Sequence, residues 1–124
     1  MFCIVLLVFM LFDNLTYQKM PYICFFINGA LRIDYAAGCA YLGDEELHLT
    51  PIEYKILCLL ATNVGKVLTH TFITQKIWGA AWENNVASLR VFMATLRKKI
   101  EAAPDSSQYI QTHIGVGYRM LRVE

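Results

Sequence analysis

Short apolar runs separated by glycine turns fill the stretch between residues 24 and 49. The runs cover residues 24–27, 31–35, 39–42 and 47–49, and the turns between them are Asn28-Gly29, Gly38 and Gly43-Asp44. Runs of this length bounded by such turns are typical of strands joined in hairpins. The pattern therefore predicts a small antiparallel sheet.

After residue 49 the apolar positions change to the spacing of helices. Residues 50–53 (Thr-Pro-Ile-Glu) predict a helix start, because Thr caps the helix, Pro fits its first position and Glu closes the capping box. The apolar face that follows comprises Ile52, Ile56, Leu59 and Leu60. Residues 63–65 (Asn-Val-Gly) predict the stop, and residues 66–68 are typical of an extended segment.

Two more helices are predicted in the second half of the chain. Thr69 caps a short one over residues 70–78. Asn84 or Asn85 caps the other, which is the longest and covers residues 84–103. Its buried stripe, at spacings of three and four, comprises Val86, Leu89, Met93, Leu96 and Ile100.

The face of the long helix opposite this stripe combines small side chains with positive charge. It gathers Ala87, Val91, Ala94, Thr95 and Lys98, with Arg90 and Arg97 at its edge. Small and hydroxyl side chains let a helix approach base edges, while Arg and Lys reach phosphates. The alternative is an ordinary solvated helix, although such a face usually carries Glu as well as Lys.

The C-terminal residues predict a hairpin. Residues 109–112 and 118–120 are typical of two strands, and the glycines between them permit the positive φ of a turn. A hairpin directly after a basic helix is the element order of a winged helix-turn-helix. The predicted fold class is therefore α+β, a winged helix-turn-helix over residues 27–124. It has a small N-terminal antiparallel sheet, three helices and a C-terminal β-hairpin wing.

The charge of the chain is unevenly distributed. The formal net charge is +1, but residues 84–124 hold six Lys and Arg residues against three acidic ones. A basic C-terminal third favours a polyanion as partner, since Lys and Arg release counterions from phosphates. A solvated charged surface is the alternative.

The chemistry-bearing residues do not form a familiar catalytic or metal site. The four cysteines, Cys3, Cys24, Cys39 and Cys58, are far apart, with no Cys-x-x-Cys pair and no His at ligand spacing. This spacing argues against zinc and against a redox motif, and it favours a reduced, cytoplasmic setting. The sequence also lacks a Ser/His/Asp arrangement, a phosphate loop and paired carboxylates. We therefore expect no enzyme, no cofactor, no metal and no small-molecule substrate.

Residues 1–26 do not fit the domain. Residues 1–12 are almost wholly apolar, but Asp13 interrupts them well short of the roughly 20 residues that a spanning helix needs. The basic region and small-residue cleavage site of a secretory signal are missing. We expect this segment to be foreign to the domain. A short membrane-associating tail is the weaker alternative.

Five motifs occur in order between residue 27 and the end of the chain. They are Leu-Thr-Pro-Ile-Glu-Tyr at 49–54, Gly-Lys-Val-Leu-Thr at 65–69, Ile-Trp-Gly at 77–79, Leu-Arg-Lys-Lys at 96–99 and Gly-Val-Gly-Tyr-Arg at 115–119. Together they resemble the C-terminal effector domain of OmpR/PhoB-type response regulators. Within that family, residues 89–97 are similar to the recognition helix of regulators of the potassium-uptake operon.

The resemblance implies that double-stranded DNA is the partner and that transcription regulation in a two-component phosphorelay is the function. The residues that it places against the major groove are Ser88, Val91, Thr95 and Lys98. It assigns further DNA contacts to Arg90 and Arg97, and phosphate-backbone contacts to Trp78, Thr112 and Tyr118. The two aromatic rings are equally typical of a core.

The chain also departs from the family. Ile114 stands in the wing where some members carry Arg, and Ala87 and Ala94 stand where others carry Arg, which indicates fewer charged contacts. The residues before Ile27 are too few for a receiver domain. We therefore expect no phosphorylation switch in this chain, and tandem contacts between copies on DNA.

A second use of the domain is a protein-interaction module. The segment over residues 79–85 has two alanines, a Trp and a single charge, so Trp82 is a candidate exposed anchor. RNA polymerase is the partner that we expect there. Binding DNA and binding a protein can coexist.

Overall fold

The computed structural model describes residues 25–79, 83–101 and 108–123. The predictions for residues 1–24 and for Trp82 lie outside these residues. The chain divides into two compact units, Met1–Leu47 and His48–Glu124. That a single domain covers residues 27–124 therefore stays a prediction. Within the described residues, no helix combines the length and the apolar character needed to cross a bilayer.

The first unit contains the predicted antiparallel sheet. Its strands are β1 (Phe25–Asn28), β2 (Leu31–Asp34), β3 (Cys39–Leu42) and β4 (Glu45–Glu46), paired in that order. The prediction of a strand at residues 47–49 was wrong. Gly43 turns with a φ of 64°. The turn places Glu45 directly opposite Leu42, so the strand begins in the charged residues before the apolar run.

The second unit contains three helices and a second sheet. Helix α2 (Pro51–Thr62) begins with the predicted capping box, in which the Glu53 N–H donates to Thr50 Oγ1 at 3.2 Å. Its buried face includes Leu57, whereas Ile52 and Leu59 are only half-buried, so the predicted apolar face is rotated. The buried face is rotated because it includes Glu53, which lies on the same side of the helix as Ile56, Leu57 and Leu60.

Helix α3 (His70–Trp78) has the predicted bounds. The hydroxyl of Thr69 accepts the Phe72 N–H at 3.0 Å, and Gly79 ends the helix in the left-handed conformation, with a φ of 82°. Strand β5 (Val67–Thr69) leads directly into it.

Helix α4 (Glu83–Ile100) is shifted from its predicted bounds. Asn84 and Asn85 lie inside the first turn of the helix, so neither of them is the cap. The helix ends at Ile100 instead of residue 103. The next carboxylate, that of Glu101, accepts the N–H groups of Tyr109 and Ile110 at 2.7 and 3.0 Å.

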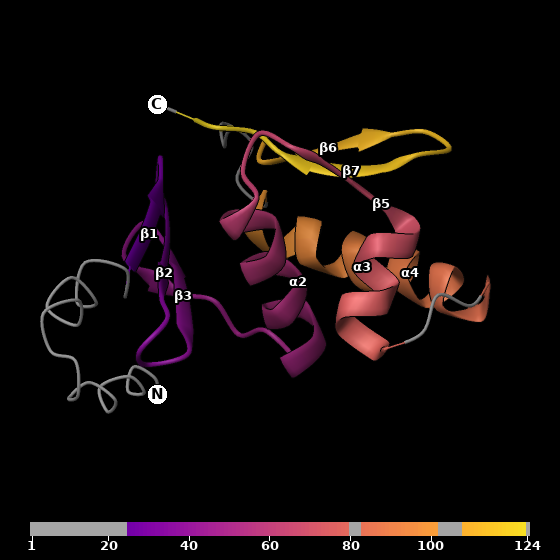
Figure 1. Ribbon diagram of the computed structural model, residues 1–124. Coiled ribbons are helices and arrows are strands. Elements are labelled where there is room, and N and C mark those ends of the chain that lie inside the picture. The colour runs from indigo at the N-terminus through magenta and orange to yellow at the C-terminus, as the bar shows by residue number, and fades with distance from the viewer. Residues whose placement is uncertain (1–24, 80–82, 102–107, 124) are drawn as a thin grey trace, which may run out of the picture. The chain divides into compact units, whose positions relative to one another are not determined.

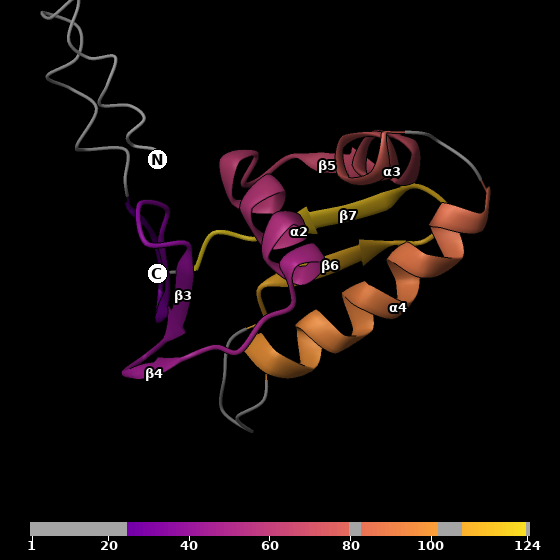
Figure 2. The ribbon, with the colours of Figure 1, turned by 90° about the horizontal axis from the view of Figure 1, so that it is seen from below.

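Strands β6 (Ile110–His113) and β7 (Gly117–Met120) form the predicted hairpin, which we call the wing. β7 lies between β6 and β5 in a three-stranded antiparallel sheet. All three helices of this unit lie on one face of that sheet (Figures 1 and 2). Three helices followed by a wing make this fold a winged helix-turn-helix.

Candidate nucleic-acid interface

The solvent-facing side of α4 has the composition that the sequence predicts. Of the predicted buried stripe, Leu89, Met93, Leu96 and Ile100 are at most 2% exposed, whereas Val86 is only half-buried. On the opposite side, the exposed residues are Ala87, Arg90, Val91, Ala94 and Lys98. Val91 alone has 63% of its surface in solvent. The helix therefore presents small and apolar side chains between a guanidinium and an ammonium group.

Two predicted groove residues lie at the margin of this surface. Ser88 and Thr95 are both half-buried. The hydroxyl of Thr95 lies within hydrogen-bonding distance of the Glu53 carboxylate and of the Phe92 carbonyl. Thr95 therefore faces α2 in the free protein, and its contact with a base stays a prediction. The spacing of residues along a helix predicts only roughly which way a side chain points. For Thr95, the Glu53 carboxylate on α2 decides that the side chain points toward α2 and not toward solvent.

Arg97 and Thr112 are brought together by the fold. The Nη2 group of Arg97 donates to Thr112 Oγ1 at 2.6 Å and to the Ile110 carbonyl at 2.9 Å. Its Nε lies 4.0 Å from Glu101. The resemblance assigned Arg97 and Thr112 to DNA separately, whereas in the free protein they connect α4 to the wing.

The two aromatic residues assigned to the phosphate backbone pack within the domain. Trp78 is half-buried, with its ring centre 6.2 Å from that of Phe92. Tyr118 is 5% exposed and meets the ring of His70 edge-on at 5.5 Å. Both rings therefore have packing roles, and only Trp78 keeps a substantial exposed surface.

His70 adds a side chain that the sequence did not single out. It is the first residue of α3, and its N–H donates to the Val116 carbonyl of the wing at 3.1 Å. Partial burial, and then the positive charge of Arg90, lower its pKa. The start of α3, the wing and Arg90 thus lie close together, and the lowered pKa of His70 favours its neutral form.

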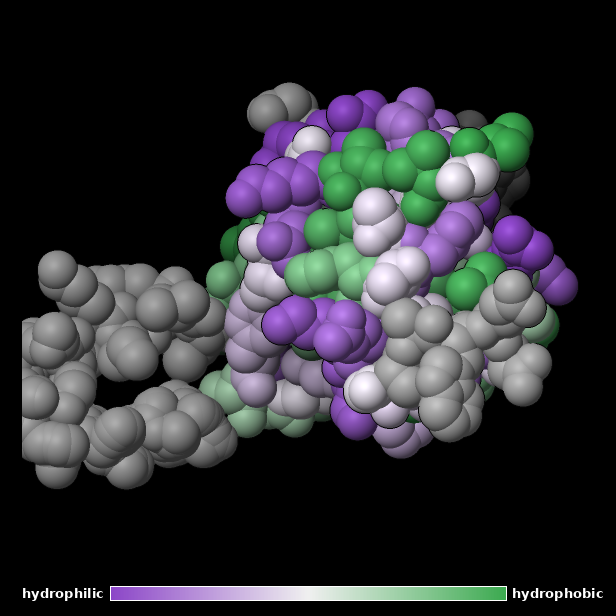
Figure 3. Space-filling model, turned by 45° about the vertical axis from the view of Figure 1, so that its right-hand side comes forward, coloured by the Kyte–Doolittle hydropathy of each residue, from purple (hydrophilic) through white to green (hydrophobic). Residues whose placement is uncertain are grey.

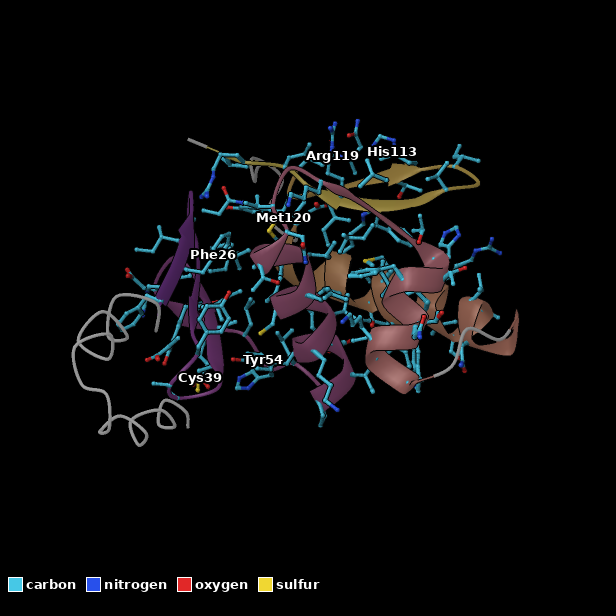
Figure 4. The ribbon with its side chains drawn as sticks, viewed as in Figure 1. Phe26, Cys39, Tyr54, His113, Arg119 and Met120 are labelled. Carbon is cyan, nitrogen blue, oxygen red and sulfur yellow. The ribbon has the colours of Figure 1, made fainter. Side chains whose placement is uncertain are left out.

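The outer surface of the wing carries a polar cluster that was also missed. Arg119 and His113 point away from the helices (Figure 4). Arg119 Nη2 donates to Gln111 Oε1 at 2.5 Å, and His113 Nε2 lies 3.1 Å from the same oxygen. Cross-strand alternation would have placed these side chains on one face had the register been known. Figure 3 shows hydrophobic side chains exposed along the wing among hydrophilic ones, and Ile114 is 93% exposed.

An ionic cluster, in which the Glu53 side chain is 3% exposed and the Lys99 side chain 35% exposed, holds α4 against the start of α2. Lys99 Nζ lies 2.7 Å from Glu53 Oε1 and donates to the His48 carbonyl at 2.8 Å. Burial raises the pKa of Glu53. The hydrogen bonds from Lys99, Thr95 and the Thr50 N–H outweigh it and hold the pKa below its ordinary value. Apart from Glu53 in the capping box, no sequence pattern indicated this cluster.

Two further features concern metal ligands and cavities in the part of the chain that the structure describes. That part of the chain contains no group of three or more His, Cys, Asp or Glu side chains placed to hold a metal ion. An open groove of about 360 Å³ runs between α2 and α3, lined by Tyr54, Lys55, Cys58, Leu59, Thr62, Lys76 and Ile77. Its lining is mostly apolar and carries no acid–base pair.

Comparison with known proteins identifies a family. The model of the family "Transcriptional regulatory protein, C terminal" matches residues 44–120. The chain is 40% identical to the transcriptional regulatory protein KdpE of Staphylococcus aureus over 98 residues, which cover 78% of this chain and 42% of that protein. It is 39% identical to the KDP operon transcriptional regulatory protein KdpE of Escherichia coli over 91 residues, or 73% of this chain and 40% of that protein. The chain thus spans about two fifths of the length of these relatives.

Among solved structures, the DNA-binding domain of the response regulator AdeR, in complex with an intercistronic region, is similar. Its TM-score is 0.64 at 25% identity, with 77% of this chain and 97% of that chain covered. The fold, the family model and the two KdpE relatives agree with one another.

Proposed function

This chain belongs to the family of C-terminal domains of transcriptional regulatory proteins, of the OmpR/PhoB type, and we propose that it binds double-stranded DNA sequence-specifically. In this proposal it is the effector domain of a two-component response regulator and acts in the bacterial cytoplasm. The KdpE relatives point to the potassium-uptake operon as its target.

One observation supports the proposal above the others, namely the exposed surface of α4. Ala87, Val91 and Ala94 leave room for the helix to approach the floor of the major groove, and Val91 suits contact with a thymine methyl. Arg90 and Lys98 flank them and are placed to reach phosphates. The buried stripe on the other side holds the helix in this orientation.

The remaining assigned residues take different roles in this proposal. Ser88 lies at the edge of the groove surface, and Trp78 supplies a backbone contact through its exposed part. Tyr118 is only 5% exposed, so its role is to pack edge-on against the ring of His70 instead of contacting the phosphate backbone itself. Arg97 and Thr112 act on DNA through the position of the wing.

Partners other than DNA are part of the same proposal. Two copies bind in tandem to a direct repeat, and RNA polymerase docks on the segment over residues 79–85. A tandem arrangement predicts two half-sites about 10 base pairs apart, one helical turn of DNA.

The experiment is selection of bound sites from random duplexes, followed by affinity measurement on the selected duplex. Lys98→Glu should abolish binding while the thermal midpoint stays that of the parent chain, because Lys98 is exposed on α4. Lys55→Glu is the matched control, since it makes the same charge change on the exposed surface of α2. Undiminished binding by Lys98→Glu would show that α4 does not face the DNA.

A further inference from the structure

Lys98 and Lys99 are neighbours in sequence but have different surroundings. Lys98 is exposed, whereas the ammonium group of Lys99 is held between Glu53 Oε1 at 2.7 Å and the His48 carbonyl at 2.8 Å. From composition alone, both lysines would count as phosphate contacts of a basic helix. The structure separates them, because the charge of Lys99 is already paired within the protein.

The carboxylate that pairs with Lys99 is almost fully buried. Only 3% of the Glu53 side chain is exposed. Besides Lys99, it accepts the Thr50 N–H at 2.9 Å and the hydroxyl of Thr95. A buried charge is tolerated when it is paired and hydrogen-bonded in this way, and removing one partner leaves it uncompensated. The contacts of Glu53 with Thr95 and Lys99 therefore form an attachment of α4 to α2 with a defined geometry.

The attachment joins two consecutive turns of α4 to one point on α2. Thr95 and Lys99 are four residues apart, so they lie on the same side of the helix. They reach different oxygens of the same carboxylate. The capping box fixes that carboxylate at the N-terminus of α2. Apolar packing is non-directional, whereas two polar attachments one turn apart oppose rotation of α4 about its axis.

We propose that Glu53, Thr95 and Lys99 are positioning residues that set the rotation of α4, and thereby which side chains it presents to the bases. This inference rests on the proposed function. A rotation of one residue position, about 100°, would turn Val91 out of the groove. Smaller rotations would still misalign Arg90 and Lys98 with their phosphates. The cluster thus acts on sequence discrimination without touching DNA.

The test compares Lys99→Met with Lys98→Met on two duplexes. One is the duplex selected by the parent chain, and the other is a scrambled duplex of the same composition. Affinities are measured over a range of salt concentrations, at a temperature where circular dichroism shows both variants fully folded. Thr95→Val serves as the second variant, because it keeps the ion pair and removes only the hydroxyl. Lys99→Arg tests whether another cation, which can also pair with Glu53, restores the affinity.

We expect Lys99→Met to weaken binding to the selected duplex about tenfold, comparable with the loss from one mismatched base pair. Its salt slope and its affinity for the scrambled duplex should stay those of the parent. Lys98→Met should reduce the salt slope by about one, as expected for a lost phosphate contact. Thr95→Val should weaken selected binding in the same manner as Lys99→Met, and Lys99→Arg should restore most of it.

Three outcomes would overturn the inference. A salt slope reduced by about one in Lys99→Met would make Lys99 a phosphate contact. Unchanged affinity in folded Lys99→Met and Thr95→Val would reduce the cluster to a stabilising role. Failure of the parent chain to select any duplex would refute the proposed function itself, and the inference with it.

Discussion

Gly117 is the position where the structure makes its sharpest steric prediction. A Cβ added there would lie 1.8 Å from the Leu68 carbonyl oxygen and 2.9 Å from Thr69 Cα, both backbone atoms of β5. Real Cβ contacts essentially never fall below 3.0 Å. Gly117→Ala therefore forces β5 and β7 apart by more than about 1 Å, because backbone atoms cannot rotate away as a side chain does.

The cost of that separation follows from what β5 contributes. Leu68 opposite Tyr118, and Thr69 opposite Gly117, are the pairs nearest the added atom. Weakening two hydrogen bonds at about 1 kcal/mol each, and unpacking part of the buried Leu68, gives a loss of about 3 kcal/mol. The same shift moves the start of α3, which β5 leads into, so DNA affinity should fall as well.

Gly115 supplies the matched control. It lies two residues earlier in the same hairpin, and a Cβ there meets nothing within 4 Å, but its φ of 77° is strained for alanine. Gly115→Ala should cost about 1 kcal/mol, because only the left-handed conformation is penalised. Urea unfolding followed by circular dichroism gives both free energies of unfolding. If Gly117→Ala were no more destabilising than Gly115→Ala, the close approach of β5 to β7 would be refuted.

Three further predictions concern individual polar groups. Arg97→Lys and Thr112→Val should each weaken DNA binding about fivefold. The double variant should lose no more than either single variant, because the two side chains are hydrogen-bonded to each other, whereas additive losses would indicate two separate DNA contacts. The pKa of Glu53 in the folded chain lies below its unfolded value of about 4.3. The ionised carboxylate therefore stabilises the folded state above that pH, and this contribution to the free energy of unfolding is lost as the pH falls through the folded pKa. The urea midpoint should accordingly fall more steeply below about pH 5 in the parent than in Glu53→Gln, and parallel curves would contradict the cluster. Cys58 is half-buried beside the groove between α2 and α3, and burial raises the pKa of its thiol to about 11. Iodoacetamide at pH 8 should therefore modify Cys58 more slowly in the folded chain than in urea, and equal rates would contradict the raised pKa.

Local signals in the sequence determined most of the elements. The capping box at Thr50, the cap at Thr69 and the stop at Gly79 are short-range chemistry between residues three or four apart, so they predict the bounds of α2 and α3. The apolar period of α4 likewise predicted its buried stripe and the exposure of Val91 and Lys98.

The wrong predictions concern positions where several residues could begin a helix or where no local pattern sets the strand pairing. Asn84 and Asn85 are good caps, yet α4 begins before them, since more than one residue can start a helix. The strand expected at residues 47–49 gave way to Glu45–Glu46, because the turn at Gly43 sets the register of the pairing. Neither outcome is encoded within a window of a few residues.

What the sequence determined by itself was the identity of the elements and the face of α4 that turns to solvent, because periodicity and capping act between near neighbours. Only the tertiary structure decided the roles of Thr95, Arg97 and Lys99. Their partners lie 42, 15 and 46 residues away along the chain. By composition, all three are simply polar residues of a basic helix. In the folded chain they hold α4 in place, because the fold brings a hydrogen-bonding partner within reach of each.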